Sequence, residues 1–184
     1  MMTSDSRTVA VIVPAYNAAG HLGPVLDGIL ERIPAIDVWV VDDGSTDGTA
    51  EVAQLRETRL IRQSPNQGKA SALRRGFQST ADYELVITMD ADGQHDPADL
   101  PKVLAAADTG DLIVGARPLA GRMPWHRQIG NRIASWVTTA LAGQPVPDSQ
   151  SGYRMHRRAV IDAIVDTIPA DSDGYLFETE ILVR

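Results

Sequence analysis

The residues with the clearest chemical potential directly follow an apolar run at residues 85–89. They read Asp-Ala-Asp-Gly-Gln-His at positions 90–95. Alternate carboxylates before a glycine turn can aim several oxygens at one point. Mg²⁺ and Mn²⁺ prefer such ligands, often one or two carboxylates completed by substrate phosphates. The segment therefore predicts a metal site at Asp90, Asp92 and Gln94. An equally open alternative is a turn whose aspartates cap a helix beginning near Pro97. His95 is interpreted as a supporting residue.

A second acidic segment reads Asp-Asp-Gly-Ser-Thr-Asp at positions 42–47. An aspartate here can accept hydrogen bonds from a base N–H or a ribose hydroxyl, which leaves the phosphates of a nucleotide free to reach a metal. The alternative is an Asx turn with helix capping by Ser45, Thr46 or Asp47. Two acidic strand ends in one sheet would repel each other unless a cation or donor groups lay between them.

The usual phosphate-binding loops are missing from the sequence. It contains no GxxxxGK[ST] and no GxGxxG, and Gly68-Lys69 lacks the upstream glycine of a phosphate loop. A P-loop ATPase or a dinucleotide enzyme is therefore disfavoured. A nucleotide could still bind if metal and arginine neutralised its diphosphate.

Arginines gather late in the chain: seven of the 17 basic residues lie between Arg117 and Arg158. Arg127 and Asn131 are one helical turn apart, and a guanidinium offers two parallel donors to a phosphate. This local bias favours an anionic ligand. For Arg122 and Arg132 a solvated polar helix face is an equal alternative.

Composition narrows the function classes. The formal net charge of −7 argues against a nucleic-acid partner, and the absence of cysteine excludes disulfide and thiolate-metal sites. No apolar run is long enough to span a bilayer, so we expect a cytoplasmic protein whose contact with the inner face of the membrane, if any, is peripheral. The length suits a single domain over residues 1–184, and residues 175–184 read as a helix that continues beyond the given chain.

Alternating strands and helices must position these residues. We expect strands at 8–13, 38–41, 60–62, 85–89 and 112–114, and helices at 21–32, 45–55, 69–79, from 97, and at 124–142. Such alternation predicts an α/β fold with a mostly parallel sheet flanked by helices. Ligands bind at the carboxyl ends of parallel strands. Three strand ends, at 14–17, 42–43 and 90–92, should therefore open onto one edge.

The ordered motifs resemble a known family. They are Val-Ile-Val-Pro-Ala-Tyr-Asn, Val-Val-Asp-Asp-Gly-Ser-Thr-Asp-Gly-Thr, Asn-Gln-Gly-Lys and Asp-Ala-Asp-Gly-Gln-His. Together they are similar to the inverting family 2 glycosyltransferases with the Rossmann-like GT-A fold. Gly-Ala-Arg at 115–117, Asp-Ser-Gln-Ser-Gly-Tyr-Arg at 148–154 and Gly-Tyr-Leu-Phe-Glu-Thr-Glu at 174–180 resemble the dolichyl-phosphate mannose synthase-like branch. Several ordered motifs are specific, whereas each alone is weak.

The resemblance implies roles for individual residues. The metal, Mg²⁺ or Mn²⁺, and the donor diphosphate fall on Asp90, Asp92 and Gln94. The resemblance places nucleoside and donor contacts on Pro14, Tyr16, Asn17, Asp43 and Lys69. Phosphate groups fall on Arg117 and Arg127, which with Asp92 form the expected catalytic set, and Asn131 is an implied ligand of the acceptor phosphate.

The implied activity is a metal-dependent hexosyl transfer from a GDP- or UDP-sugar to a polyprenyl phosphate, dolichyl or undecaprenyl. Two rivals stay open: transfer to a sugar or protein hydroxyl, with Asp148 or Glu178 as general base, and a catalytically idle nucleotide-binding module. A nucleotidyltransferase is disfavoured, because no glycine-rich, lysine-bearing N-terminal loop occurs. The polysaccharide-synthesising signature Gln-X-X-Arg-Trp is also missing, since no Arg-Trp pair is present.

Overall fold

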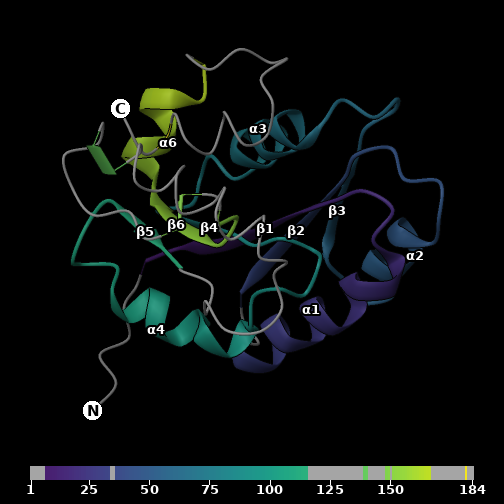
Figure 1. Cartoon of the computed structure of the whole chain (residues 1–184), viewed down its shortest axis with the longest axis horizontal. Coiled ribbons are helices and arrows are strands. Elements are labelled where there is room, and N and C mark those ends of the chain that lie inside the picture. The colour runs from purple at the N-terminus through teal and green to yellow at the C-terminus, as the bar shows by residue number, and fades with distance from the viewer. Residues whose placement is uncertain are drawn as a thin grey trace.

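The computed structural model describes residues 7–33, 36–115, 139–140, 148–149, 151–166 and 181. Strands and helices alternate along most of this range (Figure 1). Their order is β1 (Val9–Ala15), α1 (Ala19–Arg32), β2 (Asp37–Asp42), α2 (Thr49–Gln54), β3 (Arg59–Arg62), α3 (Lys69–Ser79), β4 (Leu85–Thr88), η1 (Pro97–Asp99), α4 (Leu100–Ala105), β5 (Leu112–Val114), β6 (Arg154–Arg157) and α6 (Arg158–Ile164).

One six-stranded sheet forms the centre of the fold, with the strand order β3-β2-β1-β4-β6-β5. Strands β1 to β4 are mutually parallel, while β6 runs antiparallel to both of its neighbours, β4 and β5. The predicted mostly parallel α/β sheet is confirmed. Because β2, β1 and β4 are adjacent and parallel, their carboxyl ends meet at one edge, as the sequence predicted.

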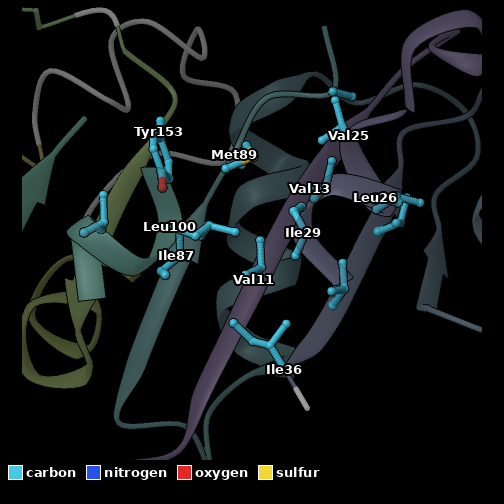
Figure 2. Close-up of a cluster of buried hydrophobic side chains, with 14 of the residues drawn as sticks. Val11, Val13, Val25, Leu26, Ile29, Ile36, Ile87, Met89, Leu100 and Tyr153 are labelled. Carbon is cyan, nitrogen blue, oxygen red and sulfur yellow. The ribbon is translucent and has the colours of Figure 1, made fainter. Parts of the chain in front are cut away.

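Helices cover both faces of this sheet (Figure 1). On one face α1 and α4 pack against side chains such as Val11 and Val13, and on the other α3 and α6 pack against Ile12. Figure 2 shows the first of these clusters. Strand β1 therefore buries alternate residues on opposite faces, which is why it reads as a continuous apolar run. A rigid central strand of this kind fixes the position of the loop that follows it.

Most predicted elements are confirmed, and two are at the predicted bounds: the helix at 69–79 and the strand at 112–114. Strand β6 and helix α6 were not predicted. Strand β6 could not be recognised from its sequence, because Arg-Met-His-Arg contains no apolar run. Its first three residues are nevertheless buried. The helix predicted at 124–142 lies outside the described residues except for 139–140, and so does the one from 175, except for Ile181.

Buried His156 in β6 gives the fold a pH-dependent stability. Burial, reinforced by the positive charges of Arg154 and Arg158, lowers the pKa of His156 from 6.5 to about 3. Its ring packs edge-on against Phe77 with centroids 5.3 Å apart, and its Nδ1 has no hydrogen-bond partner in the described structure. The imidazole is therefore neutral in the folded chain at neutral pH.

We expect the free energy of unfolding to fall as the pH is lowered from about 6.5 towards 3, because over that range the unfolded chain binds a proton that the folded chain does not. Urea unfolding at pH 7.5, 6 and 5 measures the slope. In His156→Phe, which keeps an aromatic ring but cannot titrate, this contribution should disappear. An equal slope in the variant would assign the pH dependence to other groups.

Candidate active site

The loops after β1 and β2 are joined to each other at the carboxyl edge of the sheet. Asp43 N donates to Ala15 O at 2.8 Å, and Asn17 N donates to Ser45 Oγ at 2.9 Å. The Asn17 side chain makes a second bond between the two loops, in which its Oδ1 accepts from Thr46 N at 2.9 Å. Asn17 has a φ of 49°, a left-handed conformation that asparagine tolerates better than most residues. These bonds hold two predicted nucleoside-binding loops in one arrangement.

Tyr16 and Asn17 are exposed in the first loop, whereas Pro14 is buried in the sheet. Tyr16 is 53% exposed and directly follows the last residue of β1. An exposed ring beside a polar edge offers a flat apolar surface to a ligand. The structure thus separates two predicted contact residues, because Tyr16 is accessible from solvent and Pro14 is a buried residue of β1.

Asp43 is buried and organises the loop that leads into α3. Its Oδ1 accepts from Gln63 Nε2 at 2.6 Å and from Gln67 N at 2.8 Å, and its Oδ2 accepts from Gly68 N at 2.7 Å. Gly68 needs its left-handed φ of 89° to present that amide. Asp43 therefore binds the backbone next to Lys69, a role that sequence reasoning missed.

The alternative interpretation of residues 42–47, a turn with helix capping, applies to Asp47 rather than to Asp43. Asp47 Oδ1 accepts from Thr49 N at 3.0 Å, next to the first turn of α2, and its Oδ2 accepts from Ala19 N at 3.1 Å at the start of α1. Asp42 instead accepts from Ser45 N at 2.9 Å and from Arg62 Nε at 3.0 Å. The carboxylates of Asp42, Asp43 and Asp47 thus accept hydrogen bonds from three different sets of residues.

Asp90, at the end of β4, lies between a lysine and a glycine. Its Oδ1 is 2.6 Å from Lys69 Nζ, and 22% of its side chain is exposed. A Cβ built on Gly152 would lie 2.2 Å from Asp90 Oδ2 and 2.4 Å from Oδ1, far inside van der Waals contact. The carboxylate therefore lies directly against the Gly152 backbone, and no other residue fits at position 152 without displacing it.

Asp92 and Gln94 are exposed beside this carboxylate. Gly93 adopts a φ of 71°, and Gln94 N donates to Asp92 Oδ1 at 2.9 Å, which makes a tight turn. Helix capping falls to Asp96 instead, whose Oδ1 accepts from Ala98 N at 2.9 Å. Asp90 and Asp92 therefore do not cap this helix, and both carboxylates remain candidate metal ligands.

The donor set fits a sparse divalent site. Within the described ranges, no group of three or more His, Cys, Asp or Glu side chains could hold a metal ion by itself. Two carboxylates and an amide carbonyl on one turn are nevertheless the hard ligands that Mg²⁺ and Mn²⁺ take when phosphates complete the shell. Any such site here needs the substrate as a ligand.

Residues 148–149 and 151–154 form a wall of the site, and sequence reasoning used this segment only as a family signature. The buried guanidinium of Arg154 donates to Ser151 O at 2.8 Å and to Ser149 O at 2.7 Å. Thr88 Oγ1 donates to Gly152 O at 3.0 Å. The sequence shows Ser-Gly close to an arginine here, but this spacing does not reveal that the arginine binds the backbone carbonyls before it.

His95 supports the same wall. It is buried, its Nε2 lies 3.4 Å from Ser151 Oγ, and its ring lies 5.3 Å from that of Tyr153. Ser151 Oγ donates to Gly115 O at 2.5 Å. These contacts agree with the supporting role expected of His95.

Several predicted residues lie outside the described part of the chain: Arg117, Arg127, Asn131 and Glu178. Their roles stay predictions. Asp148, the other candidate general base, is described and is only 4% exposed. The predicted residues that the structure does describe, from Tyr16 to Asp92, follow the carboxyl ends of the adjacent parallel strands β2, β1 and β4 or, in the case of Lys69, pair with Asp90.

Comparisons with known proteins show which chains this sequence is similar to. The family model for glycosyl transferase family 2 matches residues 10–165. The chain is 32% identical to a polyprenol monophosphomannose synthase of Mycolicibacterium smegmatis, over 97% of this chain and 72% of that protein. It is 31% identical to an undecaprenyl-phosphate mannosyltransferase of Micrococcus luteus, over 96% of this chain and 76% of the relative.

Solved structures show the fold. The chain matches glucosyl-3-phosphoglycerate synthase from Mycobacterium tuberculosis, in complex with Mn²⁺, uridine diphosphate and glucosyl-3-phosphoglycerate, with a TM-score of 0.75 and 22% identity. The match covers 96% of this chain and 64% of that one, so this chain spans less than two thirds of the solved enzyme. The predicted GT-A, Rossmann-like fold is thereby confirmed.

Proposed function

The chain belongs to glycosyl transferase family 2, and from that premise we propose that it moves a sugar, with inversion, from a nucleoside-diphosphate sugar to a polyprenyl phosphate. The observation that carries the proposal is the single edge where the loops bearing Tyr16, Asp43 and Asp90 meet. The names of two relatives, a polyprenol monophosphomannose synthase and an undecaprenyl-phosphate mannosyltransferase, support the acceptor class.

On this proposal the nucleoside lies on the loops after β1 and β2. Tyr16 offers its exposed ring, while Pro14, Asn17 and Asp43 shape the pocket. A solved neighbour holds Mn²⁺ and uridine diphosphate. That supports a divalent ion, Mg²⁺ or Mn²⁺, on Asp90, Asp92 and Gln94 here; when bound it would stabilise negative charge on the departing diphosphate.

The proposed reaction is one in-line displacement. An anionic oxygen of the lipid phosphate attacks the anomeric carbon, the new C–O bond forms as the bond to the donor diphosphate breaks, and the electron pair leaves with the nucleoside diphosphate. Because a lipid phosphate is already ionised near neutral pH, no side chain has to accept a proton. Arg117 and Arg127 would bind phosphate oxygens, and Asn131 would assist at the acceptor.

Transfer to a hydroxyl is the second candidate, and one observation weighs against it. A hydroxyl acceptor needs a general base within hydrogen-bond reach. Asp148, one of the two candidates, is 4% exposed and lies among buried serines. An acceptor that brings its own negative charge avoids this difficulty.

No helix among the described residues is long and apolar enough to cross a membrane. A polyprenyl acceptor is itself anchored in a bilayer. We therefore propose a cytoplasmic enzyme that meets its acceptor at the inner face of the membrane.

Donor turnover tests the proposal. We expect release of nucleoside diphosphate from a panel of UDP- and GDP-sugars to require both Mg²⁺ or Mn²⁺ and a short polyprenyl phosphate. Arg127→Ala should raise the KM for the lipid phosphate by about tenfold, the loss expected for one charge-assisted bond. Arg32→Ala, which replaces an exposed arginine in the last turn of α1, is the control and should change it by less than about twofold.

Donor release that needs metal but ignores the lipid phosphate would move the acceptor to a hydroxyl. Unchanged kinetics in Arg127→Ala would remove that arginine from the acceptor site.

A further inference from the structure

Lys69 pairs with the carboxylate that the proposed metal ion would use. Its Nζ lies 2.6 Å from Asp90 Oδ1, and 33% of the lysine side chain and 22% of the aspartate side chain are exposed. The other side of the carboxylate is closed by Gly152, against which both oxygens lie. The Gly152 backbone therefore blocks rotation of Asp90 in that direction, and a cation that binds this carboxylate must share it with the ammonium group.

The loop that carries Lys69 is tied to the proposed nucleoside pocket. Asp43 accepts hydrogen bonds from Gln67 N at 2.8 Å and from Gly68 N at 2.7 Å, the two residues before Lys69. Lys69 begins α3, so its backbone is fixed while its four-carbon side chain stays adjustable. A nucleotide bound beside Asp43 would thus bring its diphosphate close to the lysine.

Two cations compete for one carboxylate when no diphosphate is present. An ammonium 2.6 Å from a carboxylate oxygen neutralises the charge that would attract a divalent ion, and the two cations repel each other. A diphosphate changes this balance, because it offers the ammonium a second, more negative partner and offers the metal further oxygen ligands.

Building on the proposed function, we propose that Lys69 is a resident counter-ion of Asp90 that couples metal binding to donor binding. Without a diphosphate it neutralises Asp90 and weakens metal binding. With a diphosphate bound, the ammonium turns to the phosphate oxygens and releases Asp90 to the metal. Because coupling between two ligands is reciprocal, the metal must strengthen nucleotide binding by the same factor.

Mn²⁺ binding, followed by the electron paramagnetic resonance signal of the free ion, tests this without any turnover. Affinity is measured alone and with saturating UDP or GDP, in the wild-type chain and in three variants. Lys69→Met removes the charge at similar length, and Lys69→Arg keeps it. Lys102→Met is the matched control, because Lys102 makes an ion pair of the same 2.6 Å length with Asp99 outside the site.

We expect Lys69→Met to bind Mn²⁺ several-fold to about tenfold more tightly than wild type when no nucleotide is present. The gain in Mn²⁺ affinity on adding nucleotide should shrink by a comparable factor. Lys69→Arg and Lys102→Met should follow the wild type.

Unchanged or weaker Mn²⁺ binding by nucleotide-free Lys69→Met, while wild type still binds Mn²⁺ with UDP or GDP, would overturn the counter-ion role and leave the proposed function standing. If wild type bound no Mn²⁺ with either nucleotide, both proposals would fall.

Discussion

Replacing Gly152 with alanine should lower the rate of sugar transfer by about 10²- to 10³-fold, the loss typical of removing one electrostatic contact to a developing charge. The added Cβ would lie 2.2–2.4 Å from the Asp90 carboxylate, so that side chain must leave its position. Thr88 Oγ1 and Arg154 continue to hold the neighbouring backbone. We therefore expect the proposed metal site to be lost while the fold is kept.

A double-mutant cycle separates this effect from a general disturbance. If Gly152 acts only through Asp90, adding Gly152→Ala to Asp90→Ala should cost almost nothing further. Gly20→Ala is the control glycine, because a Cβ there meets no atom within 4 Å. Initial rates with a saturating donor and circular dichroism report activity and fold. Additive losses in the double variant would show that Gly152 acts independently of Asp90.

Arg154→Met should lower the free energy of unfolding by about 3–5 kcal/mol, because it removes two buried hydrogen bonds from a charged donor, each contributing about 1.5–3 kcal/mol. The guanidinium is 1% exposed and donates to the carbonyls of Ser149 and Ser151. Methionine leaves both carbonyls buried without this donor. Urea unfolding at pH 7.5 measures the loss.

Arg157→Met, on the same strand, provides the contrast. Arg157 keeps 33% of its side chain exposed and pairs with Asp108 and Asp111 at the surface, so about 1 kcal/mol or less is expected. A wild-type stability for Arg154→Met would mean that other groups satisfy the 149 and 151 carbonyls.

Elements whose signal is local could be predicted from the sequence. The helix at 69–79 alternates small or apolar residues with Arg74 and Arg75, and its bounds are confirmed. The strand ends before Asn17, Asp43 and Asp90 could be placed because each apolar run stops at a polar residue. Parallel-sheet topology then brought the three together without any knowledge of side-chain contacts.

What could not be predicted depends on contacts between distant residues. Strand β6 hides Arg154 and His156 in the sheet, and nothing local in Arg-Met-His-Arg says that carbonyls 3 and 5 residues earlier will satisfy the arginine. The Lys69–Asp90 pair and the Gly152–Asp90 contact likewise join separate loops. Asp43 was expected to face a ligand, and its bonds to Gln63, Gln67 and Gly68 depend on a loop geometry that spacing does not encode.

The strand order also has a consequence for biosynthesis. Strand β4 pairs with β1 along one edge, and its other edge is covered by β6, which the ribosome makes only after a further 65 residues, about a third of this chain. Until then Leu85–Thr88, a buried apolar strand, presents an open edge that can recruit strands from other nascent chains. Chains released early at a ribosomal stall before β6 would carry that open edge and should be especially dependent on chaperones.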